Sequence, residues 1–137
     1  DEMVAAALRH GVAPVFLATP LSSDARLLAL AAHAQGYVYV TARVGITGER
    51  GSVDANLDAE VARVRRCFDL PLLCGFGISG PEQLLAVRAA GADGAIVGSA
   101  TVRRIADNLG DPDAIVSAVR AFVRTLRLAA DSAAPDR

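Results

Sequence analysis

Two runs of sequence carry the clearest signal in this chain: GFGIS at residues 75–79 and GAIVGSA at residues 94–100. Each is a short apolar run with glycine and a hydroxyl side chain at its end, and each precedes a helical pattern. Two such strand-to-helix turns side by side leave backbone N–H groups free to bind a phosphate. The same glycines also suit tight turns that bind nothing. Because the two runs end consecutive predicted strands, we predict a phosphate site.

Composition narrows the class of protein. The chain has 137 residues, which suits one domain, and 53% of them are hydrophobic. A net charge of −1 and 4% aromatic residues argue against nucleic-acid binding. No apolar run approaches the ~18 residues of a membrane span, and Asp1-Glu2-Met3 does not have the form of a signal peptide. Cys67 and Cys74 lack a metal or redox spacing, so we expect reduced thiols, no metal site and a cytoplasmic location.

Apolar runs alternate with helical patterns along the chain. Ser22 or Ser23 is expected to cap one helix, and the run Ser79–Glu82 has the form of a capping box for another. Strands are expected over residues 13–18, 37–41, 72–75 and 95–97. Helices are expected over residues 1–10, 24–35, 57–68 and 81–90, from residue 99, and from residue 111 to about 128.

This alternation predicts an α/β fold with a parallel sheet and right-handed crossovers. Four βα units fit either an open doubly wound sheet or half of a (β/α)₈ TIM barrel, since a whole barrel usually needs about 250 residues. The count alone does not decide between them. In such barrels the loops after strands seven and eight form a phosphate site, which matches the two glycine turns.

The strand at residues 37–41 leads into a long loop, punctuated by glycine, that reaches about Asn56. Loops of this length in compact βα proteins are often lids over a site. A solvated surface connection fits the same residues equally well.

Three runs make a resemblance specific: GYVYVTARVGITG at 36–48, LLCGFGIS at 72–79 and ADGAIVGSA at 92–100. Together they resemble the C-terminal half of the tryptophan synthase alpha chain. The tyrosine-containing strand and the RVGITG run separate this family from other phosphate-binding barrels. The resemblance implies that residues 1–130 form barrel strands five to eight of a TIM-barrel domain. Residues 131–137 are expected to form a disordered tail.

The family is a carbon–carbon lyase of tryptophan biosynthesis. It cleaves indole-3-glycerol phosphate to indole and glyceraldehyde 3-phosphate while bound to a beta chain that holds pyridoxal phosphate. The resemblance therefore implies a beta-chain partner and no cofactor on this chain. Two alternatives stay open: a non-catalytic phosphate-binding half-barrel, and a related barrel enzyme such as indole-glycerol-phosphate synthase or a sugar-phosphate isomerase.

The resemblance also implies roles for single residues. Thr47 would lie on the lid and support a catalytic aspartate, and Arg43 would help to order that lid. The residues implied to contact the phosphate are Gly48, Gly77, Gly98 and Ser99. Those implied to line the indole side are Leu17, Tyr39, Phe76 and Ile96.

The family's catalytic glutamate and aspartate belong to its N-terminal half, on strand two and in the following loop. Glu49 and Asp54 do not occupy those positions, so we expect the isolated chain to be inactive. The outer strands at residues 13–18 and 95–97 would each present an unpaired edge. Since Phe16 or Leu17, Val40 and Leu73 would then expose an inward face, self-association is expected.

Overall fold

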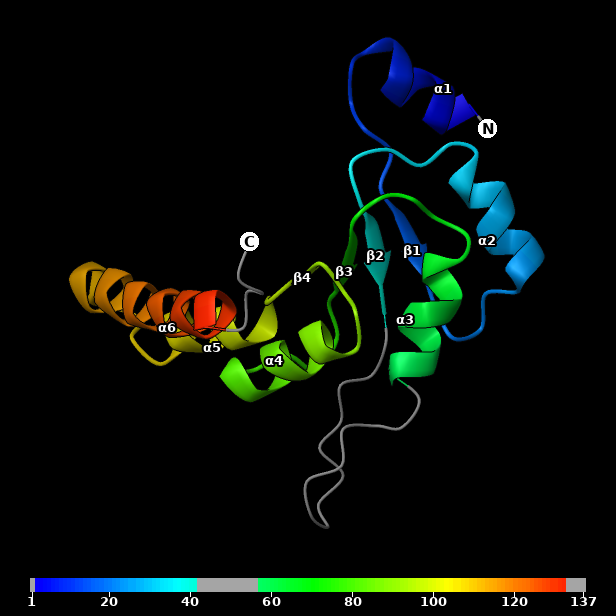
Figure 1. Cartoon of the computed structure of the whole chain (residues 1–137). Helices are drawn as coiled ribbons and strands as arrows, with labels where there is room; N and C mark the ends of the chain where they lie inside the picture. The colour runs from blue at the N-terminus through cyan, green and yellow to red at the C-terminus, as the bar shows by residue number, and fades with distance from the viewer. Residues whose placement is uncertain (1, 42–56, 133–137) are drawn as a thin grey trace.

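In a computed structural model, residues 2–41 and 57–132 are described (Figure 1). Helices and strands alternate, as the sequence predicts. The elements are α1 (Glu2–Arg9), β1 (Phe16–Ala18), α2 (Asp24–Ala31), β2 (Val38–Val40), α3 (Leu57–Arg65), β3 (Leu72–Cys74), α4 (Pro81–Ala89), β4 (Gly94–Ala95), α5 (Ser99–Ala106) and α6 (Pro112–Ser132).

The four strands form one parallel sheet in the order β1-β2-β3-β4. Sequential strands are therefore neighbours, and β1 and β4 are the two edges, as expected. The strands are shorter than predicted: β4 covers only Gly94–Ala95, where residues 95–97 were expected. The carboxyl ends of all four strands lie at the same edge of the sheet, because parallel strands share one direction.

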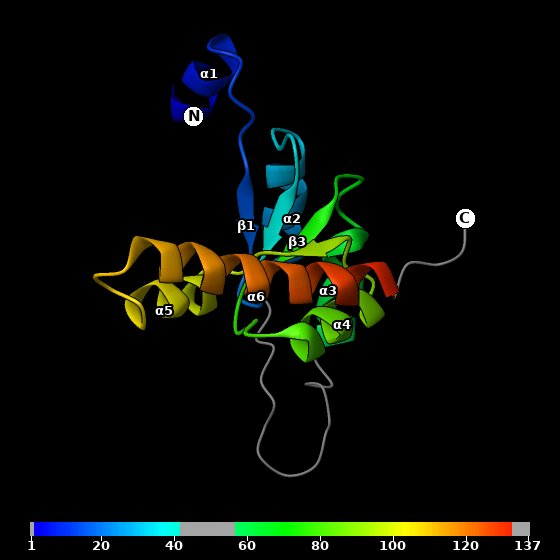
Figure 2. The ribbon, with the colours of Figure 1, turned by 90° about the vertical axis from the view of Figure 1, so that its left-hand side faces the viewer.

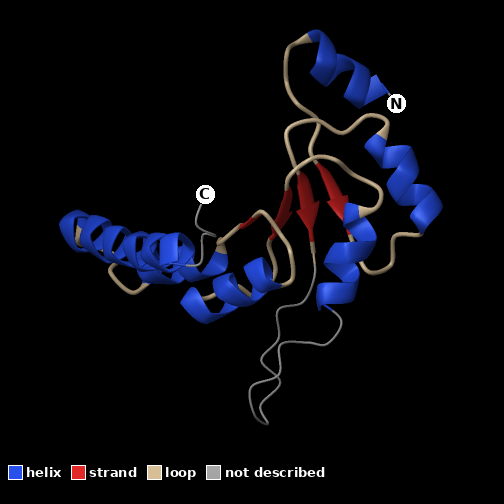
Figure 3. Ribbon diagram, in the orientation of Figure 1, coloured by secondary structure: helices blue, strands red, loops and turns tan. Residues whose placement is uncertain are grey.

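One face of the sheet is covered by helices. Val38 and Val40 of β2 and Leu72 and Cys74 of β3 are fully buried there. They form one core with the buried residues of the helices, such as Leu27 of α2. Figure 3 shows α2 and α3 on one side of the strands. The prediction that Val40 belongs to the inward face is thus wrong, because alternate residues of a strand point to opposite faces.

The opposite face carries a row of residues in register across the sheet: Leu17, Tyr39, Leu73 and Gly94. Leu17 is 56% exposed. A Cβ on Gly94 would lie 2.9 Å from Leu73 Cδ2, so glycine allows the leucine to fold over β4. Leu17 and Leu73 were predicted to lie on the inward face, and they do share this face. No described helix contributes to a core over it.

A second, smaller core joins the last three helices. Leu84 of α4, Ala100 of α5 and Phe122 and Leu126 of α6 are buried together. Figure 2 shows α6 running alongside α4 and α5. The helix continues to Ser132, beyond the expected end near residue 128, so residues 131 and 132 are helical rather than part of a tail. Residues 133–137 lie outside the described part of the chain.

Helix caps agree with the sequence in one case and differ in another. Ser23 caps α2, since its Oγ accepts a hydrogen bond from the Arg26 amide at 3.2 Å. The predicted capping box before α4 is wrong. Gly80, not Ser79, is the N-cap and makes no side-chain bond, while Ser79 Oγ donates to Gln83 Oε1 at 3.3 Å. Pro81 still occupies the first turn, as expected.

Candidate functional site

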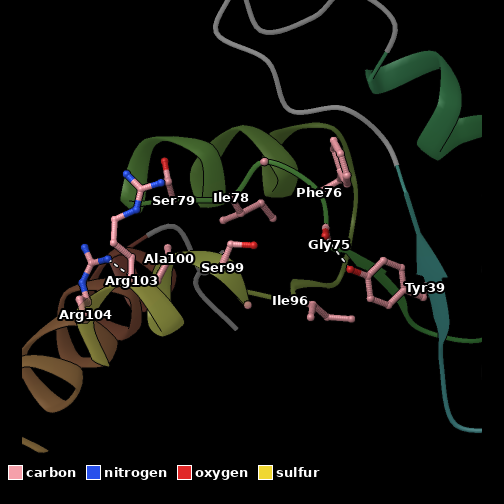
Figure 4. A pocket seen from close by; sticks show the side chains of 12 residues that line it. Tyr39, Gly75, Phe76, Ile78, Ser79, Ile96, Ser99, Ala100, Arg103 and Arg104 are labelled. Atoms are coloured by element: carbon pink, nitrogen blue, oxygen red, sulfur yellow. Dashed lines mark hydrogen bonds between the residues drawn. The ribbon is translucent and has the colours of Figure 1, made fainter. Parts of the chain in front are cut away.

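A cavity of about 900 Å³ lies beyond the carboxyl ends of β3 and β4 and beside β2 (Figure 4). In parallel α/β proteins this end of the sheet is where ligands bind. The loops after β3 and β4 supply most of its wall. It is lined by Tyr39, Gly75, Phe76, Gly77, Ile78, Ser79, Ile96, Gly98, Ser99, Ala100, Arg103 and Arg104.

Two turns bring backbone groups to this cavity. Gly77 has a φ of +79°, a conformation that glycine adopts without strain. Gly98 is the N-cap of α5, and Ser99 is its first residue. The first amides of a helix have no acceptor within the helix, and its N-terminus carries partial positive charge. A Cβ on Gly98 would meet nothing within 4 Å, so the space beside it is open. The arrangement suits an anion.

Apolar and aromatic side chains line another part of the cavity. Phe76 is 52% exposed there, and Ile96 and Tyr39 lie nearby (Figure 4). The Tyr39 hydroxyl donates a hydrogen bond to the Gly75 carbonyl oxygen at 2.6 Å, which fixes the ring. A Cβ on Gly75 would lie 2.2 Å from the ring and from its hydroxyl oxygen, so only glycine fits under it. This wall can accept a flat, apolar group.

The structure brings together most of the residues predicted for the site. Six of them line this one cavity: Tyr39, Phe76, Gly77, Ile96, Gly98 and Ser99. Leu17 does not line it; it lies on the same sheet face, in register with Tyr39. Arg43, Thr47, Gly48, Glu49 and Asp54 lie outside the described residues. The individual roles of all these residues stay predictions.

Sequence reasoning missed two arginines of α5. Arg103 and Arg104 both line the cavity. The signal that could have found Arg103 is its spacing, since residues four apart share one face of a helix and Ser99 is four residues earlier. Arg104 is held elsewhere: it donates to the Ala100 carbonyl oxygen at 2.7 Å, and its guanidinium carbon lies 3.4 Å from the centre of the Phe122 ring.

Groups that transfer protons near neutral pH are absent from the described lining, which contains no carboxylate and no imidazole. Cys74 lies next to this region but is buried, and burial raises the pKa of its thiol to about 11, so it stays protonated. Cys67 and Cys74 are both free thiols, as expected. Within residues 2–41 and 57–132, no three His, Cys, Asp or Glu side chains are grouped to hold a metal ion.

A parallel sheet of βα units with glycine turns after its last two strands is typical of (β/α)₈ barrels, here as four units. The family model for the tryptophan synthase alpha chain matches residues 1–131. The chain belongs to the tryptophan synthase alpha chain family. It is 44% identical over 131 residues to the alpha chain of Methanoregula boonei and 43% identical over 128 residues to that of Pectobacterium atrosepticum.

Coverage shows that the match concerns part of the family's length. These alignments cover 96% and 93% of this chain but 49% and 48% of the two relatives. The chain therefore spans about half the length of the curated relatives it matches.

None of the described helices has the length and the apolar composition that a membrane span requires.

Solved structures give the same result. The alpha chain of Legionella pneumophila subsp. pneumophila superposes with a TM-score of 0.81 at 28% identity, covering 99% of this chain and 49% of that one. A Pyrococcus furiosus structure of the tryptophan synthase a2b2 complex superposes with a TM-score of 0.79 at 28% identity, covering 93% of this chain and 50% of that one. The half-barrel prediction is confirmed, and the open doubly wound alternative is not supported.

Proposed function

We propose that this chain forms the phosphate and indole-side half of an alpha-chain active site that cleaves indole-3-glycerol phosphate to indole and glyceraldehyde 3-phosphate. The observation that carries the proposal is the shared cavity. It combines two glycine turns suited to a phosphate with an aromatic and apolar wall suited to an indole ring. Membership of the family supports tryptophan biosynthesis as the setting.

In this proposal the phosphate end is formed by Gly77, Gly98 and Ser99. Gly48 lies outside the described residues, and its contact with the phosphate stays a prediction. The ring lies against Tyr39, Phe76 and Ile96. Leu17 does not line the cavity and lies beside Tyr39 on the same sheet face. Holding both ends of the substrate fixes the scissile bond in one geometry, which lowers the entropy cost of the reaction. This chain thus supplies binding and orientation.

Cleavage also needs proton transfer. The bond between the indole carbon and the glycerol chain breaks, a proton is added to that carbon, and one leaves the glycerol hydroxyl. No described residue of the cavity wall is a suitable acid or base. In the family these steps belong to the glutamate and aspartate of the N-terminal half, with Thr47 supporting the aspartate. We therefore expect the 137-residue chain alone to bind without turnover.

A beta-chain partner follows from the same proposal. The sequence contains no lysine, so this chain cannot form the Schiff base that anchors pyridoxal phosphate in enzymes. That cofactor would belong to the partner. A cytoplasmic location stays a prediction.

The second candidate function is a phosphate-binding half-barrel without catalysis. The absence of carboxylate and imidazole groups from the described cavity wall favours it for the isolated chain. A chimera separates the two: the part of the Methanoregula boonei alpha chain that precedes its matched residues is fused before Asp1. We expect the chimera to release indole from indole-3-glycerol phosphate, and the 137-residue chain to release none. A folded chimera without indole release would contradict the lyase proposal.

Two variants of the chimera test the phosphate end. Gly98→Val places a side chain in the open space beside the N-terminus of α5 without meeting a described atom at Cβ, so KM should rise at least tenfold. Gly80→Val is the matched control, because Gly80 is also an N-cap but does not line the cavity. Equal effects of the two changes would show that the turn at Gly98 is only structural.

A further inference from the structure

Arg103 is a charged residue of the described cavity wall to which the proposed function gives no role. It lies on α5, lines the cavity together with Ser99 and Gly98, and is exposed. Figure 4 shows its side chain extending toward Ser79, at the end of the cavity opposite Tyr39. A cation at that end faces the same space as the two glycine turns.

The geometry of a helix explains this position. Arg103 follows Ser99 by four residues, so both lie on one face of α5. The Arg103 side chain extends from this face toward Ser79, so its guanidinium borders the same cavity as Ser99. The backbone turns offer only partial charges, whereas a guanidinium offers a full charge and several N–H donors in a plane.

Comparison with other arginines shows that Arg103 is available. Arg63, Arg65 and Arg127 each pair with a carboxylate. Arg104 is held by the Ala100 carbonyl oxygen and the Phe122 ring. For Arg103, no carboxylate oxygen of the described residues lies within 4.0 Å, and no side-chain hydrogen bond to them is formed. Its charge is therefore not neutralised by the described part of the fold.

We propose that Arg103 is a specificity-determining residue that pairs with the phosphate dianion and selects phosphate esters over neutral polyols. The inference rests on the proposed phosphate site and adds a charged ligand to it. Charge-assisted, bidentate hydrogen bonds from arginine to phosphate are stronger than bonds between neutral groups. Loss of this one guanidinium should therefore weaken phosphate binding more than loss of a surface charge elsewhere.

The test uses calorimetric titration of the 137-residue chain with glycerol 3-phosphate, and with glycerol as the neutral probe. Arg103→Gln should weaken binding of glycerol 3-phosphate about tenfold or more, and Arg103→Lys should restore part of it. Arg124→Gln is the matched control, since Arg124 is an exposed arginine of α6 outside the cavity. Raising the salt concentration should weaken the wild type more than Arg103→Gln. Circular dichroism should show equal folding.

The outcomes separate the two claims. If the wild type binds glycerol 3-phosphate and Arg103→Gln binds it equally well, Arg103 is not a ligand and the phosphate site still stands. Equal weakening by Arg124→Gln would also overturn the inference, because net charge alone would then explain it. If the wild type does not bind glycerol 3-phosphate at all, the proposed phosphate site is wrong and the role of Arg103 falls with it.

Discussion

Tyr39 and Gly75 act as one unit at the scale of single residues. The hydrogen bond from the tyrosine hydroxyl to the glycine carbonyl joins β2 to the turn after β3. Because a Cβ on Gly75 would overlap the ring, the size of residue 75 decides where the tyrosine lies. One wall of the cavity thus depends on a residue that contributes no side chain.

Gly75→Ala should displace the Tyr39 ring, break its hydrogen bond and lower the free energy of unfolding by about 1–3 kcal/mol. Urea denaturation measures the change. The double variant Gly75→Ala with Tyr39→Val should lose less than the sum of the two single variants, because the smaller side chain no longer overlaps the new methyl group. Additive losses would show that the ring and residue 75 do not interact.

Site residues could be predicted from the sequence where their role depends on a backbone turn that glycine makes possible. Gly77, Gly98 and Ser99 follow from glycine and hydroxyl residues at predicted strand ends, and they do share one cavity. The resemblance to a family, not the residue pattern, predicted Tyr39 and Ile96. Arg103 was missed because an arginine in an amphipathic helix looks like a surface residue until the helix is placed beside the turns.

At the scale of elements, Arg63 links α3 to the connection between β1 and α2. Its guanidinium donates to the carbonyl oxygens of Ser22 at 2.7 Å and Thr19 at 3.1 Å, and it pairs with Glu60 and Asp24. The Glu60 hydrogen bond raises its pKa further, so it stays charged at every practical pH. The hydrogen bonds to main-chain oxygens hold the loop against the helix.

Arg63→Gln should lower the free energy of unfolding by about 1–3 kcal/mol, because two loop carbonyl groups lose a charged donor. Arg66→Gln, in the turn just after the same helix, is the control, since Arg66 is exposed. It should change stability by less than about 0.5 kcal/mol. Thermal unfolding followed by circular dichroism compares the two. A larger loss from Arg66→Gln would contradict the role given to Arg63.

Asp93 joins α3 to the sheet and gives a pH-dependent prediction. Burial acts to raise the pKa of Asp93, but hydrogen bonds from Arg65 and from the Leu72 amide, at 2.7 Å, outweigh this and lower the pKa below its usual range. Because the pKa of Asp93 is lower in the folded state than in the unfolded state, its carboxylate stabilises the fold at pH values above the unfolded-state pKa. That contribution is lost as pH falls through the folded-state pKa.

The difference in unfolding free energy between the wild type and Asp93→Asn should therefore be largest at pH 6 and should decrease below about pH 4. Urea titrations at several pH values measure it. Asp131→Asn is the control, since Asp131 pairs with Arg127 on an exposed surface and should show a small difference throughout. A difference that grows toward acid pH would contradict the assignment.

The presence and order of helices and strands could be predicted where the hydrophobic pattern extends over many residues. The residues at which they begin and end could not. The order of strands and helices follows from alternating patterns, and β1 to β4 form the expected parallel sheet. The capping box predicted at Ser79–Glu82 is wrong because Ser79 lies one residue before the N-cap, Gly80. From there its hydroxyl does not cap the first amides of α4. The end of α6 at Ser132 was missed because alanines give no stop signal.

For the whole molecule, the main feature is the sheet face that carries Leu17, Tyr39 and Leu73, over which no described helix contributes to a core. Leu17 is 56% exposed, and β1 and β4 are the two edges of the sheet in the part of the chain that the structure describes. Exposed apolar edge strands favour pairing with another chain. We therefore expect the isolated 137-residue chain to self-associate, with a mass in sedimentation that rises with concentration.

Leu17→Lys should reduce this association, because a charge on an edge strand opposes pairing. Leu21→Lys is the control: Leu21 is also exposed, at 97%, but lies in the loop after β1 rather than on the sheet face. A monomer at all concentrations, with one sharp unfolding transition, would contradict the prediction. Equal effects of both variants would show that the sheet face is not the surface involved.

In the proposed site, the turns after β3 and β4 together hold a phosphate ester. Amide nuclear magnetic resonance of the ¹⁵N-labelled chain during titration with glycerol 3-phosphate tests it most directly. The largest saturable shifts should fall on the amides of Gly77, Gly98 and Ser99, with small shifts at the control position Gly80. Shifts that do not saturate, or that fall mainly outside these two turns, would contradict the claim.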